Sequence, residues 1–179
     1  MISFILRIFD FFYFALFGGV KSARRKGVIV GENCRVYIYS WGSEPFLIRL
    51  GDNVTVTSGV KFITHDGSTC LIKNRHGERY QKYGRIFLGD NVFIGVNSII
   101  LPDVTIGSNV IIAAGSVVTR DLVDPGVYAG VPVKRLADFK EYESSVVSSC
   151  CNDGDLNGIT NYKKRVFKAL SIQNEKKYD

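Results

Sequence analysis

A six-residue repeat runs through the second half of this sequence. Each of six consecutive hexads begins with an aliphatic residue and carries Asn, Asp or Gly at its fourth position. The hexads start at Leu88, Ile94, Ile100, Ile106, Ile112 and Val118. A period of six fits neither the 3.6-residue repeat of a helix nor the two-residue alternation of a simple strand. It predicts short strands separated by sharp turns, as in a parallel β-helix built from hexapeptides.

Less regular stretches of the same repeat precede these hexads. One begins at Val30, and a second begins at Leu50 and ends near Asp66. Three hexads make one triangular coil, so equivalent positions should recur after every third hexad. We therefore expect Leu88 to stack beside Ile106, one coil further along the chain.

The positions within a hexad have different structural roles. The first residue is large and aliphatic or Phe and the fifth is mostly small, and we expect both to point into a narrow core. The fourth residue stands at a corner, where Asn and Gly adopt the left-handed backbone conformation at little cost. This conformation is predicted at Asn53, Asn91, Asn97, Asn109 and Gly115.

A long polar loop, residues 66–86, interrupts the repeat. Such an insertion is more often functional than accidental, although an excursion without a role costs little free energy. His65, one of only two histidines, directly precedes the loop. Because an imidazole with a pKa near ~6.5 can take a proton from a hydroxyl at neutral pH, we interpret His65 as a candidate general base. The other histidine, His76, is expected to be a solvated side chain of the loop.

The N-terminal segment, residues 1–27, is apolar and aromatic and ends in a basic cluster. We predict a helix that caps the open end of the coils, because the end of a repeat array needs a cover. Contact of residues 1–26 with a membrane surface remains the alternative. The segment lacks the form of a signal peptide, and its longest apolar run is too short to span a bilayer.

The remaining chain divides into the repeat domain, residues 28–135, and a C-terminal helical extension, residues 136–179. In the extension we expect a short helix over 136–142, a polar linker over 144–158 and a last helix over 162–170 with a frayed tail.

Composition restricts the partners and the compartment. The net charge of +6 indicates anionic partners such as phosphates, and the absence of an arginine-rich arm or a zinc finger argues against nucleic acid. The four cysteines form no CxxC motif, so reduced thiols in a cytoplasmic protein are expected, with peripheral contact at the inner face of the membrane as an option.

The hexads and three further motifs together resemble the left-handed β-helix, or hexapeptide-repeat, acetyltransferase family. The motifs are Thr64-His65-Asp66-Gly67, the segment 113–121 (Ala-Ala-Gly-Ser-Val-Val-Thr-Arg-Asp) and the segment 128–135 (Tyr-Ala-Gly-Val-Pro-Val-Lys-Arg). The resemblance covers about residues 28–137 and is closest to the acetyl-CoA-dependent saccharide O-acetyltransferases. It implies an all-β, left-handed parallel β-helix that forms a homotrimer with active sites between subunits.

The resemblance also implies roles for particular residues. His65 would be the catalytic base, and Asp66 would either orient its imidazole or stand at the start of the loop without that role. Acetyl-CoA would lie in a groove where small residues expose backbone amides and basic residues meet the phosphates. The matching positions are Gly95, Val96, Ala113, Ala114, Thr119, Arg120 and Lys134. Each of them taken singly is also explained by hexad packing or by solvation of a surface charge.

The implied activity is transfer of acetyl from acetyl-CoA to a saccharide hydroxyl, in the biosynthesis of a surface polysaccharide. No metal is expected, because the γ-class carbonic anhydrases that share the hexads bind zinc through three histidines and this chain has two. Two alternatives stay open. One is N-acetylation of a nucleotide-linked amino sugar, and the other is a non-catalytic β-helix that serves assembly.

Overall fold

The computed structural model describes residues 2–178 of the chain. Contacts divide the chain into two compact units, Met1–Leu136 and Ala137–Asp179. The first unit contains short strands and two helices, and the second consists mainly of helices. The prediction of a mainly β protein with a few helices is confirmed.

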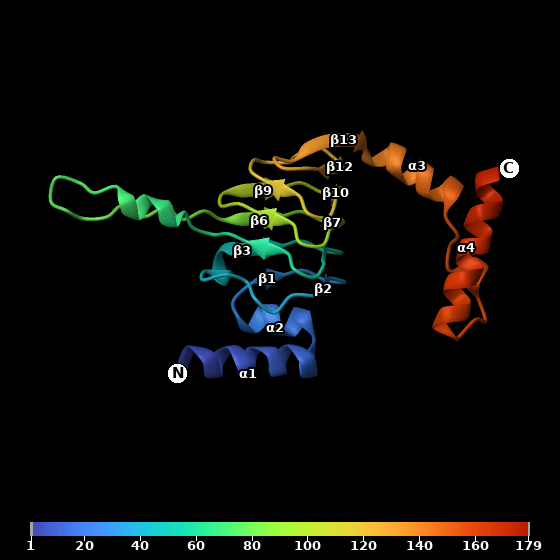
Figure 1. Cartoon of the computed structure of the whole chain (residues 1–179), viewed down its shortest axis with the longest axis horizontal. Helices are drawn as coiled ribbons and strands as arrows, with labels where there is room; N and C mark the ends of the chain where they lie inside the picture. Colours follow the sequence, from blue (N-terminus) through green and yellow to red (C-terminus); the bar gives the residue numbers. More distant parts are fainter. Residues whose placement is uncertain (1, 179) are drawn as a thin grey trace. The chain divides into compact units, whose positions relative to one another are not determined.

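The strands form three sheets, and within each sheet they lie one above another (Figure 1). The first sheet contains β1 (Ile29–Val30), β3 (Ile48–Leu50), β6 (Ile86–Leu88) and β9 (Val104–Ile106). The second contains β2 (Arg35–Val36), β4 (Thr55–Val56), β7 (Val92–Ile94), β10 (Val110–Ile112), β12 (Gly126–Ala129) and β13 (Lys134–Asp138). The third contains β5 (Lys61–Phe62), β8 (Ile99–Ile100) and β11 (Val117–Val118).

The chain visits the three sheets in turn and then returns to the first, beside the strand that it left. Ile86 pairs in parallel with Val104, 18 positions later, and Leu88 pairs with Ile106. The pairing of Ile94 with Ile112 has the same spacing. The predicted stacking of equivalent hexad positions is therefore confirmed.

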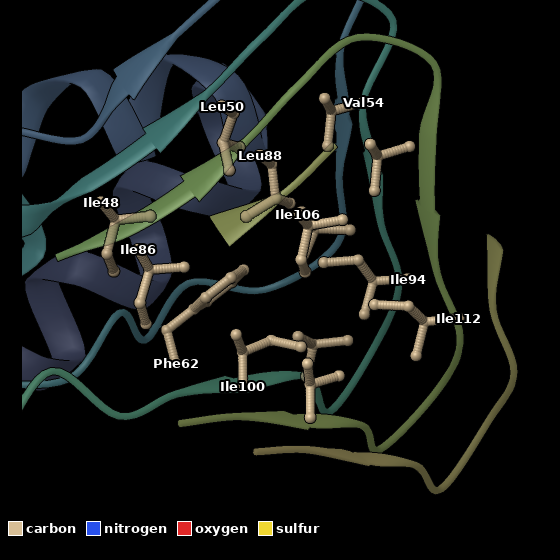
Figure 2. Close-up of a cluster of buried hydrophobic side chains, with 14 of the residues drawn as sticks. Ile48, Leu50, Val54, Phe62, Ile86, Leu88, Ile94, Ile100, Ile106 and Ile112 are labelled. Atoms are coloured by element: carbon tan, nitrogen blue, oxygen red, sulfur yellow. The ribbon is translucent and has the colours of Figure 1, made fainter. Parts of the chain in front are cut away.

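The first and fifth residues of the hexads fill the space between the three sheets (Figure 2). Every such residue from Leu50 to Leu122 is buried except Asp66, where the loop begins, and the buried set includes two serines, Ser98 and Ser116. Burial of one large aliphatic side chain contributes roughly 1.5–3 kcal/mol, so this repeated core is the main source of stability for strands only two or three residues long.

The predicted corner residues adopt the left-handed conformation. The asparagines have φ angles between 53° and 60°, and Gly115 has a φ of 70°. Three of these asparagines also bond to one another along the stack. The side-chain amide of Asn53 donates to Asn91 at 2.7 Å, and that of Asn91 donates to Asn109 at 3.2 Å. The corners are thus stabilised both by backbone preference and by a ladder of hydrogen bonds.

The N-terminal segment forms two helices, α1 (Ile2–Phe17) and α2 (Gly19–Arg25), separated by Gly18. Helix α2 packs against β1 and β2, at the first coil, and buries Ala23 completely. Helix α1 contacts α2, and its Asp10 pairs with Arg25 and Lys26. The arrangement agrees with a cap on the first coil. No helix within residues 2–178 is long and apolar enough to cross a membrane.

The polar loop leaves the stack and returns to it at the same place (Figure 1). The amide of Asp66 donates to the carbonyl of Lys82 at 2.9 Å, and the amide of Gly84 donates to the carbonyl of Thr64 at 2.8 Å. Beyond this closure, Ile48 pairs with Ile86, 38 positions later, so the stack continues as though the loop were absent. The loop begins with a short 3₁₀ helix, η2 (Gly67–Leu71).

Two expectations for the C-terminal unit are wrong. Helix α3 spans Phe139–Ser149, so the helix begins later than predicted and residues 144–149 of the expected linker are helical. The side chain of Glu141 accepts a hydrogen bond from the amide of Asp138 and fixes the start. Serines in the helix bond back to carbonyls one turn earlier, as Ser144 does to Lys140, which satisfies the hydroxyls without breaking the helix.

The last helix, α4, spans Tyr162–Tyr178 and follows η3 (Gly154–Leu156). The tail expected to fray after Leu170 is therefore helical. Ser171 bonds to Glu175 one turn further on, and lysines in the last turn interact favourably with the helix dipole.

Candidate active site

His65 stands at the point where the chain leaves the stack for the loop. Its side chain is 43% exposed, and its Nδ1 lies 3.0 Å from Oε2 of Glu44, whose side chain is only 17% exposed. An ionised carboxylate can only accept, so the contact favours the neutral tautomer with the proton on Nδ1. The Nε2 of His65 is then left as an acceptor, which is the form that a general base requires.

Glu44 is a site residue that the sequence reasoning missed. It precedes the 3₁₀ turn η1 (Pro45–Leu47), and its Oε2 also accepts a hydrogen bond from the buried hydroxyl of Thr64 at 2.6 Å. This bond, with a further contribution from His65, lowers the pKa of Glu44 against the opposing effect of burial. Glu44 is therefore ionised at neutral pH and can stabilise a protonated His65.

In the sequence, only the pairing register of the first coils could have indicated that Glu44 lies beside Thr64 and His65. Arg35 pairs with Thr55, 20 positions later, so a residue of this coil lies beside the residue 20 positions further on. The same offset sets Glu44 beside Thr64. The turn before Pro45 hides this register in the sequence, because it carries no hexad pattern.

Asp66, the other predicted catalytic residue, does not hold the imidazole. Its Oδ1 accepts hydrogen bonds from the backbone amide of Ser68 at 3.0 Å and from the Ser68 hydroxyl at 2.6 Å, which caps η2. The hydroxyl of Ser68 is the main cause that lowers the pKa of Asp66. Asp66 thus stands at the start of the loop, and Glu44 takes the place next to Nδ1.

A pocket of about 200 Å³ lies between His65 and the loop. Its lining combines the imidazole with cationic and aromatic side chains of the loop, and the rings of His65 and Tyr83 are 6.2 Å apart. The loop residues that bring charge or a ring to it are Arg79, Tyr80, Lys82 and Tyr83. A base beside aromatic rings and hydrogen-bond donors suits a ligand rich in hydroxyl groups.

Four of the predicted cofactor-binding residues meet at one corner of consecutive coils. Gly95 and Val96 follow β7, and Ala113 and Ala114 follow β10 one coil later. A Cβ on Gly95 would approach the Ala114 nitrogen to 2.4 Å, so stacking alone already requires glycine there.

The free backbone amides at this corner belong to Val96 and Ala114. The amides of Gly95 and Ala113 donate to Ile112 and Tyr128 of the next coils. Those of Val96 and Ala114 are in exposed residues and have no acceptor within the described part of the chain. They are therefore the donors that a bound ligand can use.

The three remaining predicted residues are exposed. Thr119 and Arg120 follow β11, and Lys134 begins β13. Their side chains make no ion pair with the other described residues. Over the same part of the chain, no group of three or more His, Cys, Asp and Glu side chains is placed to hold a metal ion.

Comparisons with known proteins agree with this arrangement. The model of the family "Bacterial transferase hexapeptide (six repeats)" matches residues 85–120. Protein CapG of Staphylococcus aureus is 43% identical over 159 residues, which cover 87% of this chain and 90% of CapG. A galactoside O-acetyltransferase of Lactococcus lactis is 40% identical over 101 residues, or 54% of this chain and 45% of that protein, so the chain spans about half its length. The solved structure of the hexapeptide-repeat containing acetyltransferase VCA0836 from Vibrio cholerae has a TM-score of 0.50 at 23% identity and covers 63% of each chain, which shows a common fold.

Stacked hexads that hold a histidine–carboxylate pair beside a pocket agree with the class that the family match indicates, the transferases built on hexapeptide repeats. Identity to CapG over most of both chains shows that this protein belongs to the hexapeptide-repeat acetyltransferase family, an acyltransferase family. The resemblance stated from the sequence is thereby confirmed.

Proposed function

We propose that the protein transfers acetyl from acetyl-CoA to a saccharide hydroxyl, in the biosynthesis of a surface polysaccharide. The observation that carries this proposal is the contact of 3.0 Å between His65 and Glu44 at the edge of the pocket. The name of the Lactococcus lactis relative, a galactoside O-acetyltransferase, supports a sugar hydroxyl as the acceptor.

In the proposed reaction, Nε2 of His65 takes the proton of the acceptor hydroxyl. The oxygen attacks the thioester carbonyl, a new C–O ester bond forms, and the C–S bond breaks. The CoA thiolate then takes the proton from His65. Because the acceptor oxygen attacks the thioester directly, no covalent enzyme intermediate is formed. Ionised Glu44 stabilises the imidazolium in between, and general base catalysis of this kind contributes about 10²–10⁴ to the rate.

The donor would lie along the corner where two coils expose unpaired backbone amides. The backbone amides of Val96 and Ala114 would donate to the pantetheine arm. Gly95 and Ala113 have small or no side chains and would leave room for this arm beside the coils. Arg120 and Lys134, with Thr119 beside them, would meet the phosphates of CoA as point charges. Exposure of all three side chains supports this assignment.

We further infer the hand and the assembly of the stack. The three sheets that the chain visits in turn support a β-helix over residues 28–135, and the likeness to hexapeptide-repeat acetyltransferases supports its left hand. A homotrimer would place each active site between neighbouring subunits, which agrees with the 43% exposure of His65.

A cytoplasmic enzyme with peripheral contact at the membrane would suit a polysaccharide acceptor. Large apolar side chains remain exposed on α1 and support such contact. They are Ile8, Phe9, Phe11, Phe12, Leu16 and Phe17.

The test is an acetyl-transfer screen with acetyl-CoA against mono- and oligosaccharides, read as a mass increase of the acceptor. An alkali-labile ester would identify a hydroxyl acceptor, whereas a stable amide would identify an amino sugar. His65→Ala should lower turnover at least ~100-fold while the oligomer and CoA binding persist. His76→Ala, in the exposed loop, is the matched control. Near-normal turnover of His65→Ala would refute the assigned base, and absence of CoA binding would favour a non-catalytic assembly module.

A further inference from the structure

We propose that the acceptor sugar carries a negative charge on its own ring substituents, and that Arg79, assisted by Lys82, binds this charge in the pocket beside His65. The inference rests on the proposed function and names the class of acceptor: a sugar acid or a sugar phosphate, rather than a neutral sugar.

The guanidinium of Arg79 is an uncompensated charge. Arg79 lines the pocket, and among the described residues no carboxylate pairs with it. The acid next to it in the sequence, Glu78, accepts instead from the side-chain amide of Asn74 at 2.7 Å. Because arginine presents a planar set of donors that matches a carboxylate or phosphate with two parallel bonds, a free arginine in a pocket favours such an anion.

Lys82 adds a second cation to the same lining. Asp66 is the only carboxylate among the described residues that line the pocket, and Ser68 occupies it with two hydrogen bonds. The charge of Lys82 helps to lower the pKa of Asp66, after the larger effect of Ser68, so the two charges lie close enough to interact. Among the residues that line the pocket, one anion thus faces two cations, while the carboxylate of Glu44 does not line the pocket and is engaged by Thr64 and His65.

The size of the pocket limits where the negative charge can be. At about 200 Å³, it is smaller than the roughly 300–1,000 Å³ of sites that enclose a drug-sized ligand. It therefore suits a single sugar ring, held against the half-exposed rings of Tyr80 and Tyr83. A charge that meets Arg79 inside this space belongs to the ring that is acetylated, and a nucleotide attached to the sugar would lie outside.

The test compares matched neutral and charged acceptors. The methyl glycosides of glucose and glucuronate, and those of galactose and galacturonate, differ only in the carboxylate, and glucose 1-phosphate tests a phosphate. We expect kcat/KM to be at least about tenfold higher for the charged member of a pair, as one charged hydrogen bond predicts. Arg79→Gln should bring this ratio close to one, mainly through the KM of the charged sugar. Arg75→Gln is the control, because Arg75 belongs to the same loop but does not line the pocket.

Binding provides a readout that does not depend on turnover. In the His65→Ala variant, titration with methyl glucuronide should show tighter binding than methyl glucoside, and addition of Arg79→Gln should abolish the difference. Equal binding of both sugars, or a rise in the KM of acetyl-CoA alone in Arg79→Gln, would overturn the inference, the latter by assigning Arg79 to the donor phosphates. Failure of the proposed function would look different: no sugar would be acetylated at all, even where a charged sugar binds.

Discussion

The Nδ1 of His65 and the Oε2 of Glu44 lie 3.0 Å apart although the two residues are 21 positions apart in the sequence. The same carboxylate oxygen accepts from Thr64, which is buried in the stack. The orientation of the half-exposed imidazole is thus fixed from the rigid part of the fold. Loss of the Glu44 charge should therefore affect mainly catalysis, whereas loss of the Thr64 hydroxyl should affect the dependence of stability on pH.

Glu44→Gln should lower kcat about 100-fold, at the lower end of what general base catalysis supplies, because a neutral amide cannot stabilise the imidazolium of His65. The KM of acetyl-CoA should stay unchanged, and urea denaturation should show that the variant is folded under the assay conditions. Steady-state kinetics measure both values. The control is Glu78→Gln, an exposed loop carboxylate whose partner is Asn74, and equal losses in the two variants would contradict the role of Glu44.

Thr64→Val should reduce the dependence of stability on pH in the acid range. Since the folded-state pKa of Glu44 is lowered, chiefly by Thr64, the ionised carboxylate stabilises the fold above its unfolded-state pKa of about 4.3, and this contribution disappears as the pH falls through the folded-state pKa. Without the Thr64 hydroxyl the two pKa values come closer together. The difference in unfolding free energy between pH 7 and about pH 4, measured by urea denaturation, should shrink.

Thr57→Val is the matched control for this effect. The hydroxyl of Thr57 donates to the carbonyl of Ile94 at 2.6 Å and touches no carboxylate. This variant should lose stability by a similar amount at both pH values. If Thr64→Val behaves in the same way, the hydroxyl of Thr64 has no influence on the ionisation of Glu44.

A separate prediction concerns the core of the stack. Ile94 is fully buried and pairs with Val56 on one side and Ile112 on the other. Ile94→Ala should lower the free energy of unfolding by about 2–5 kcal/mol, and Ile94→Val by about 0.5–1.5 kcal/mol, because the larger truncation leaves a cavity in contact with both coils. Denaturant unfolding measures these values, and similar losses in both variants would show that the core collapses around the site.

Substitutions of Asn91 can separate the two contributions to the stability of a corner, which are the backbone preference and the ladder of side-chain hydrogen bonds. Its φ is 56°, and it bonds to Asn53 and Asn109 through its side chain. Asn91→Gly keeps the backbone preference and loses the ladder, whereas Asn91→Ala loses both. We expect the alanine variant to be less stable than the glycine variant by about 1 kcal/mol. Equal stability of the two variants would mean that the backbone conformation at this corner carries no cost.

Much of the stack could be predicted because the residues of each hexad specify their own strand and corner. Burial of Ile94 and Ile112 follows from their places in the repeat, and the left-handed conformation of Asn91 follows from the preference of asparagine at a corner. These are local rules, so a single sequence is sufficient to apply them. The coil that starts at Leu88 keeps the spacing of 18 positions that three hexads require, and the spacing shortens to 16 in the next coil, where Val110 pairs with Gly126.

The partner of the base could not be predicted in this way. Glu44 lies in a turn without a hexad pattern, and its contact with His65 depends on a coil of 20 positions, two more than the 18 of three hexads. Helix α3 was partly missed for another reason. Its serines favour turns when they are considered singly, whereas in the helix Ser144 finds an acceptor in the preceding turn.

The closure of the loop at its base, through Asp66 with Lys82 and Thr64 with Gly84, has an evolutionary consequence. Since the coils pair across the insertion as if it were missing, the segment that we propose to bind the acceptor can be exchanged for one of another length without disturbing the scaffold that holds His65. With the proposed roles of the loop and of His65, acceptor recognition and chemistry are encoded in separate stretches of the gene. New acceptors would then become accessible by mutation of one short segment, while the reaction itself is inherited unchanged.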